Sequence, residues 1–189
     1  MIVTRALTGR RVRLVPEHVE HAPLIARWND DPEVRHWLHR SEDPPELFER
    51  AAVEQLIRAM LADPSHVRFV IETEDGEPIG DVGLLGIHRS GRAELSIVIG
   101  EKTHWARGYG ADAIRTLLRF GFESLGLRRV TLIADADNAR GIACYLRCGF
   151  RQEGVLRAHR LRYGRPLDMV TMAVLREEFA ALERAAGAG

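Results

Sequence analysis

The stretch T-H-W-A-R-G-Y-G-A-D-A, residues 103–113, joins an apolar run to a helix-forming sequence through Gly108 and Gly110. A strand that ends in such a loop and opens directly into a helix points several unpaired backbone N–H groups at one place, where the helix dipole adds positive potential. Glycine lets the backbone approach a ligand closely and adopt positive φ. The stretch therefore predicts a phosphate-binding loop.

Two glycines alone do not define the ligand. The Walker A pattern is missing because no Gly-Lys-Ser/Thr follows, and the dinucleotide fingerprint lacks its third glycine and its acidic strand end. Taken by itself, the stretch fits an ordinary left-handed turn as well as a phosphate loop. The elements on either side must decide between them.

The segments before the loop predict helices and then antiparallel strands. Apolar spacing favours helices over 17–28, where Pro23 is a point of early break, over 30–38 with Pro32 in its first turn, and over 46–61. Alternation predicts strands over 10–17, 66–73, 78–88 and 93–100, and Asp75-Gly76 is a hairpin signal between two of them.

The segments after the loop alternate between helix and strand. We expect a helix over 110–125 stopped near Gly126, a buried strand over 128–135, and a second helix over 138–149 with Gly149 as its C-cap. Two closing strands follow over 150–157 and 166–175. This order predicts a mixed sheet with helices on both faces.

Length and charge limit the classes of function. With 189 residues, 46% of them hydrophobic, the chain should form one domain over 1–189, with 184–189 as a frayed tail. Lys plus Arg and Asp plus Glu both number 27, so no overall field attracts nucleic acid or an anionic membrane. A polyanionic ligand must be held by a local site.

Location and redox state follow from the apolar runs and the cysteines. No run approaches the roughly 20 apolar residues that span a bilayer, and the N-terminus has no signal-peptide core, so we expect a cytoplasmic protein without membrane contact. Cys144 and Cys148 have no second Cys or His pair nearby. They are expected to be reduced core thiols, and no metal is expected.

The segment that follows the strand expected over 128–135 carries further signals. Asn138 suits a helix N-cap, and Tyr145 lies about two turns on, so one helix face presents both. Together A-R-G-Y-G-A-D-A, N-A-R-G-I-A-C-Y-L-R-C-G-F, and G-F-R-Q-E-G-V-L-R followed by Y-G-R-P-L-D resemble the GNAT superfamily of acyl-CoA N-acyltransferases over nearly the whole chain. Within it, the best likeness is to the branch that acetylates ribosomal-protein N-termini, called RimJ/RimL-like. Trp105 departs from the typical family loop, which has Gln or Arg there.

The resemblance implies a fold and a co-substrate. The fold would be α/β, of the α+β kind, with a mixed, mostly antiparallel sheet of six to seven strands and helices on both faces. Acetyl-CoA would bind at the splay between strands 95–99 and 130–134, without a metal. The implied cofactor-binding residues are Ile97, Val98, Ile99, Arg107, Gly108, Tyr109, Gly110, Ala111, Asn138, Arg140 and Arg147.

Acetyl transfer from a thioester to an amine needs a neutral amine, a polarised carbonyl and a proton for the departing thiolate. Tyr145 matches the family position that donates to the coenzyme sulfur, and the N–H of Val98 or Ile99 is placed to hold the oxyanion. Three carboxylates compete as the base. Glu94 is the first, on the same strand side as Ser96 and Val98, and Glu101 and Glu153 are the others, each able to act through water.

The acceptor is the least determined part. Its pocket should draw on the amino-terminal helices and late strands, where the notable residues are His36, Trp37, His88, Tyr163 and Asp168. The expected reaction is acetylation of a protein N-terminal α-amine. Acetylation of a small amine (polyamine, amino acid or aminoglycoside) and non-catalytic acyl-CoA sensing remain open. Homodimers are common among such proteins, so self-association is open as well.

Overall fold

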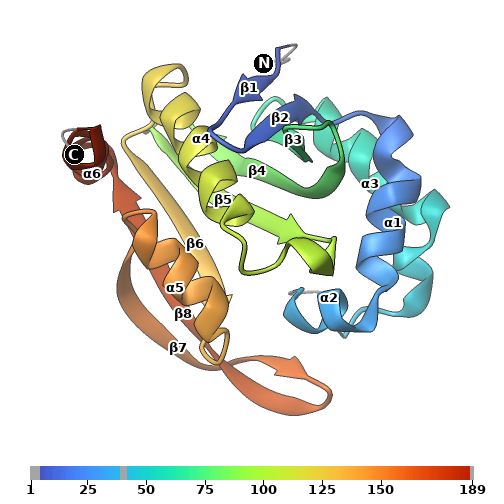
Figure 1. The fold of residues 1–189 in the computed structure, drawn as a ribbon. Helices are drawn as coiled ribbons and strands as arrows, with labels where there is room; N and C mark the ends of the chain where they lie inside the picture. Colours follow the sequence, from blue (N-terminus) through green and yellow to red (C-terminus); the bar gives the residue numbers. More distant parts are fainter. Residues whose placement is uncertain (1–4, 39–41, 188–189) are drawn as a thin grey trace.

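The computed structural model describes residues 5–38 and 42–187, and its strands form one eight-stranded sheet in the order β1-β2-β3-β4-β5-β6-β8-β7 (Figure 1). All neighbouring strands are antiparallel except β5 and β6. The sheet exceeds the expected six to seven strands because the two-residue β1, too short to show alternation, pairs with β2. The strands are β1 (Leu7–Thr8), β2 (Val12–Pro16), β3 (Val67–Thr73), β4 (Pro78–His88), β5 (Arg92–Ile99), β6 (Arg129–Asp135), β7 (Arg151–Arg162) and β8 (Arg165–Leu175).

The helices follow the expected order with shifted starts. The helix expected from residue 17 begins at Ala22, with Pro23 in its first turn, where no N–H is required of it. A 3-10 turn, Val19–His21, precedes it, and another, Pro45–Phe48, replaces the first turn of the third expected helix. The helices are α1 (Ala22–Asp30), α2 (Pro32–Trp37), α3 (Arg50–Ala62), α4 (Tyr109–Glu123), α5 (Ala139–Arg147) and α6 (Arg176–Gly187).

The carboxyl-terminal helix α6 is absent from the sequence expectations. Residues 184–187, expected to fray, continue α6 to Gly187, and 188–189 lie outside the described residues. Tertiary contacts hold this helix in place. Phe179 is buried, with its ring centroid 5.5 Å from that of Phe122 on α4, and Arg119 Nη2 donates to Glu183 Oε2 at 2.6 Å.

Two apolar clusters lie on opposite faces of the sheet. Phe69 and Ile71 of β3 belong to the larger cluster, which they share with α4 and with Phe179 of α6. Val70, between them in the strand, belongs to the smaller cluster with α1 and α3. Because successive side chains of a strand point to opposite faces, the helices cover both faces of the sheet, as expected.

The sheet opens between its two parallel strands. Only Arg92, Ala93 and Glu94 of β5 pair with Arg129–Thr131 of β6. Beyond them β5 stays paired with β4 up to Ile99, and β6 stays paired with β8 up to Asp135, so the two strands diverge (Figure 1). This is the splay expected between 95–99 and 130–134, although Val130 and Thr131 still pair.

Candidate active site

The glycine loop leaves the amino end of α4 open. Gly108 is its N-cap with φ of 88°, a conformation that favours glycine, and no side chain caps the helix. The N–H of Asp112 makes the first intrahelical bond, to the Gly108 oxygen at 3.1 Å. The N–H groups of residues 109–111 therefore have no acceptor within the helix and point at an anion site.

Arginines and aromatic rings surround this helix end. The Arg11 guanidinium lies 4.6 Å from the ring centroid of Tyr109 and donates to the Arg107 oxygen, while the Arg107 guanidinium lies 5.7 Å from the same ring. On the other side, Arg140 stacks on Trp105 at 3.8 Å. Arg11 was missed by sequence reasoning, because a basic residue beside a strand carries no specific signal.

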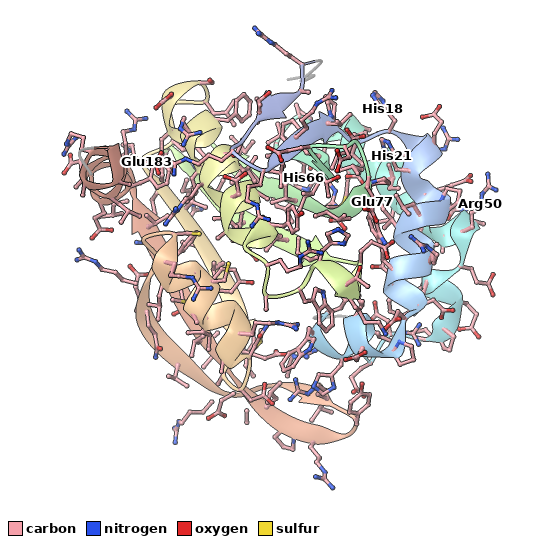
Figure 2. All side chains as sticks on the ribbon, in the orientation of Figure 1. His18, His21, Arg50, His66, Glu77 and Glu183 are labelled. Atoms are coloured by element: carbon pink, nitrogen blue, oxygen red, sulfur yellow. The ribbon has the colours of Figure 1, made fainter. Side chains whose placement is uncertain are left out.

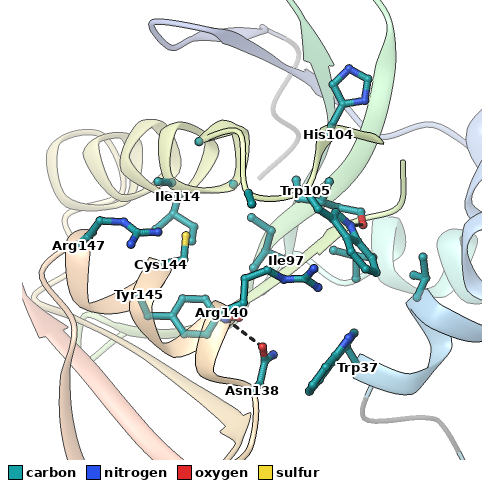
Figure 3. Close-up of a pocket in the computed structure, with 18 of the residues that line it drawn as sticks. Trp37, Ile97, His104, Trp105, Ile114, Asn138, Arg140, Cys144, Tyr145 and Arg147 are labelled. Atoms are coloured by element: carbon teal, nitrogen blue, oxygen red, sulfur yellow. Dashed lines mark hydrogen bonds between the residues drawn. The ribbon is translucent and has the colours of Figure 1, made fainter. Parts of the chain in front are cut away.

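A first cavity, of about 190 Å³, runs from this helix end to the splay (Figure 3). Tyr145 and Trp37 stand on its walls, from α5 and α2. Arg107 and Tyr109 are not among its lining residues. Of the cofactor-binding residues expected from the sequence, those that line it are Ile97, Val98, Ile99, Gly108, Gly110, Ala111, Asn138, Arg140 and Arg147.

A second cavity, of about 320 Å³, lies between the sheet and helices α1 and α3. Four carboxylate residues are among its lining: Glu17, Asp81, Glu94 and Asp135. The two cavities share lining residues at the splay, so they meet there. The shared residues are Trp37, Leu38, Ile97, Val98, Asn138 and Tyr145.

Helix α5 carries two of the shared residues. Asn138 is its N-cap, with Oδ1 accepting from the Gly141 N–H at 2.9 Å (Figure 3). Tyr145 packs edge-on against Phe150, with centroids 6.1 Å apart. Burial, reinforced by the nearby thiols of Cys144 and Cys148 and by Asp135, raises the pKa of Tyr145 above its usual value. The phenol therefore keeps its proton at neutral pH and can donate it.

Along β5, the backbone N–H and C=O groups of successive residues point alternately toward β4 and toward the splay. The Val98 oxygen faces β4, since a Cβ on Gly80 would lie 2.1 Å from it, and the Gly100 N–H also donates to β4. The Ile99 oxygen instead accepts from Trp105 Nε1 at 2.7 Å. Because the N–H and C=O of one strand residue point the same way, Ile97 and Ile99 direct their backbone groups at the splay.

The three candidate bases lie in different surroundings. Glu94 lines the second cavity. Glu101 accepts from Trp28 Nε1 at 2.7 Å and pairs with Arg27, and Glu153 accepts from Arg129 at 2.7 Å. Neither Glu101 nor Glu153 lines either of these two cavities, and each forms an ion pair with an arginine.

Three rings expected in the acceptor pocket, those of His36, Trp37 and Tyr163, lie close together. The His36 ring centroid lies 4.6 Å from that of Trp37 and 5.8 Å from that of Tyr163. These contacts bring α2 against the turn between β7 and β8. Trp37 lines both cavities, whereas Tyr163 is exposed.

Two other residues expected there are elsewhere. His88 is bonded to Ser90 at 2.8 Å in a turn, and Asp168 accepts from the Ala158 N–H at 2.7 Å. Neither lines the two cavities, since His88 is the last residue of β4 and Asp168 lies near the start of β8.

Several buried charges of the second cavity were missed. Asp135, at the end of β6, accepts from Arg160 Nε and Nη2, each at 2.8 Å. Asp81 of β4 and Arg68 of β3 form an ion pair on the sheet face that lines this cavity. The usable signal was Asp81 itself, an aspartate within an apolar strand sequence, since acidic residues are almost never fully buried without a partner.

Within residues 5–38 and 42–187, no group of three or more His, Cys, Asp and Glu side chains is arranged to hold a metal ion. None of the helices in the same ranges has the length and apolar character needed to cross a membrane.

Comparison with known proteins identifies the family. Residues 11–151 match the family model described as the acetyltransferase (GNAT) domain. The spermidine N(1)-acetyltransferase of Escherichia coli (strain K12) is 30% identical over 95% of this chain and 94% of its own length. The uncharacterized N-acetyltransferase p20 of Bacillus licheniformis is 27% identical over 95% of this chain and 98% of its own. The chain belongs to the GNAT acetyltransferase family.

Solved structures agree on the fold. The spermidine N-acetyltransferase of Vibrio cholerae in complex with CoA and spermine superposes with a TM-score of 0.80 at 24% identity, covering 89% of this chain and 98% of its own. The protein is an N-acetyltransferase, and acetyl-CoA is its co-substrate. The expected RimJ/RimL-like placement is not supported, since the relatives at 30% and 31% identity are named spermidine N(1)-acetyltransferases, and the tubulin N-acetyltransferase of Mus musculus matches at 25%.

Proposed function

We propose that this protein transfers an acetyl group from acetyl-CoA to a primary amine of a small molecule, with polyamines as the first acceptors to test. The observation that carries the proposal is the meeting of two cavities at the splay, one beside an open helix end and the other lined by four carboxylates. A thioester and a cationic acceptor can thereby reach one point from two sides.

The acceptor side distinguishes this proposal from the expected acetylation of protein N-termini. Arg160 pairs with Asp135, and among the described residues Arg68 is the single cation beside Glu17 and Asp81. Glu94 and the excess negative charge of that pair are therefore what attract and hold a cationic amine. The relatives named as spermidine N(1)-acetyltransferases favour the same class, which was the alternative at the sequence level. A protein N-terminal amine is therefore the less supported acceptor.

The residues around the first cavity fit acetyl-CoA, which supplies the acetyl group as a thioester. The open N–H groups of residues 109–111 would hold the pyrophosphate, with Arg11 and Arg140 adding positive charge. The backbone groups of Ile97 and Ile99 at the splay would bind the pantetheine. Since the backbone groups of Ile99 face the splay, the Ile99 N–H rather than that of Val98 would hold the developing oxyanion.

Two side chains would move the protons. Glu94 accepts the proton that the amine loses as its nitrogen forms the C–N bond, directly or through water. Tyr145, which lines both cavities and keeps its phenolic proton at neutral pH, donates that proton to the sulfur as the C–S bond breaks. The acetylated amine and free CoA thiol then leave, Glu94 releases its proton to water, and Tyr145 regains one from water.

The test is a thiol-release assay with acetyl-CoA against three acceptor classes: spermidine and short diamines, peptides with free Ala or Ser N-termini, and aminoglycosides. We expect turnover with the amines of the first class, and calorimetry should show CoA binding. Turnover on the peptides alone would overturn the acceptor assignment. CoA binding without turnover on any class would favour an acyl-CoA sensor.

A further inference from the structure

Three charged residues on the floor of the second cavity form a buried cluster. Arg68 Nη2 donates to Asp81 Oδ1 at 2.7 Å, and Arg68 Nε donates to Glu17 Oε2. The side chains of Glu17, Arg68 and Asp81 are 0%, 10% and 6% exposed, and the three residues line the cavity. We call them the Glu17–Arg68–Asp81 cluster.

The cluster is one positive charge short. It contains two carboxyl groups and a single guanidinium, and Glu17 Oε1 is buried without a hydrogen-bond partner among the described residues. Burial raises the pKa of both Glu17 and Asp81, against the opposing effect of Arg68. A buried acceptor without a partner costs free energy, so a proton or a bound cation is needed to complete the cluster.

The cluster is also close to the reaction centre. Asp81 on β4 lies directly opposite Val98 on β5, and Val98 borders the splay. Adjacent strands are about 4.8 Å apart, which places Asp81 one strand spacing and Arg68 on β3 about two spacings from β5. An acceptor that reaches both the splay and the cluster therefore needs a second amino group that a chain of methylene groups separates from the first.

The wall facing the cluster is apolar. Helices α1 and α3 contribute Ile25, Val53, Leu56, Ile57 and Met60 to the same cavity. A chain of methylene groups would bury its surface against these side chains, while its charged ends would reach the carboxylates. The cavity thus combines an apolar wall with anionic groups set at a distance from the splay.

We propose that the Glu17–Arg68–Asp81 cluster binds the second, non-reacting ammonium group of a diamine or polyamine acceptor, and thereby selects such acceptors over monoamines. The inference rests on the proposed function, since it assigns the far end of the same acceptor. The bound ammonium replaces the proton of the cluster as partner of Glu17 Oε1. Binding of a diamine is therefore linked to loss of that proton, and it weakens as the pH falls.

The experiment compares 1,4-diaminobutane with butylamine, an acceptor of equal chain length that has one amino group. The variants are Glu17→Gln and Asp81→Asn, which keep side-chain shape and a hydrogen-bond acceptor for Arg68. Glu183→Gln serves as the matched control, because Glu183 lies on α6, across the molecule from α1 and α3 (Figure 2). Steady-state kinetics are measured from pH 6 to 9, with diamine binding by calorimetry in the presence of CoA.

We expect each cluster variant to lower kcat/KM for the diamine about tenfold or more through KM. The value for butylamine should change less than threefold, and the control should match wild type. In wild type the KM for the diamine should rise with falling pH more steeply than the KM for butylamine, and this difference should vanish in Glu17→Gln. Equal losses for both amines, or no loss for either, would overturn the proposal.

Binding measurements separate this inference from the proposed function. If wild type turns over no amine, the proposed function fails. Diamine binding that weakens about tenfold in Glu17→Gln would still support the cluster as an ammonium site. Calorimetric binding that is absent in wild type, or unchanged in both cluster variants, would overturn it.

Discussion

The two cavities that meet at the splay are built in different ways. The first depends on backbone groups from short continuous stretches, 97–111 and 138–147, and on one open helix end. The second depends on side chains from five strands or strand ends, spread from Glu17 to Asp135. A backbone site requires glycines and caps in fixed order, so it leaves a readable motif, whereas a side-chain site on neighbouring strands leaves scattered residues.

The largest effect is expected from breaking the charged floor of the second cavity. Arg68→Met leaves two buried carboxyl groups without their cation, and it should lower the free energy of unfolding by about 3–5 kcal/mol. Urea unfolding at pH 7 measures this. Arg119→Met, which removes a more exposed ion pair with Glu183, should cost no more than about 1 kcal/mol. Equal small losses in the two variants would show that the cluster is not a stability element.

On the shared boundary, Tyr145→Phe should lower kcat about 100-fold or more, because it removes the proton donor for the departing sulfur while keeping the ring that packs on Phe150. The affinity for CoA, measured by calorimetry, should stay within threefold. An unchanged kcat would mean that water protonates the sulfur and that Tyr145 only packs.

Glu94→Gln should have a smaller effect, about tenfold in kcat/KM at pH 7. The loss should shrink toward pH 9, because more of the acceptor amine is already neutral there and needs no base. A pH profile of kcat/KM measures this. Wild-type values at every pH would remove Glu94 from the mechanism.

A pH-dependent stability difference should distinguish the floor of the second cavity. Since the pKa of Glu17 is raised in the folded protein, chiefly by burial, its contribution to stability is full below its unfolded pKa of about 4.5 and is lost as pH rises. A glutamine side chain at this position does not titrate. Glu17→Gln should therefore gain stability relative to wild type between pH 4.5 and pH 7, as measured by urea unfolding. A constant difference across this range would contradict the raised pKa.

The smallest effect is expected outside both cavities. Glu153→Gln removes an exposed pair with Arg129, so kcat/KM should stay within twofold of wild type. A loss comparable to that of Glu94→Gln would mean that Glu153 reaches the acceptor and belongs to the site.

Sequence patterns were most informative where they reflect local physics. The Gly108 loop, the Asn138 cap and the alternating strands each depend on neighbours a few residues away, and the structure has all three. Helix α6 was missed because its place depends on Phe122 and Arg119 of α4, which are distant in sequence. Glu101 and Glu153 stayed candidates beside Glu94, the first choice, because sequence does not show which carboxylate has an arginine beside it.

The sequence by itself determined the order of elements from β2 to β8, the open end of α4 and the face of α5 that presents Asn138 and Tyr145, since hydrogen bonding and periodicity act over one or two turns. Only the tertiary structure decided which charges share a cavity. Strand register places Asp81 beside Val98 and Arg68 between Glu17 and Asp81, and pairing between distant segments sets that register. The anion-binding side is thus specified by residues close together in the sequence, whereas the acceptor side is assembled only when the sheet forms.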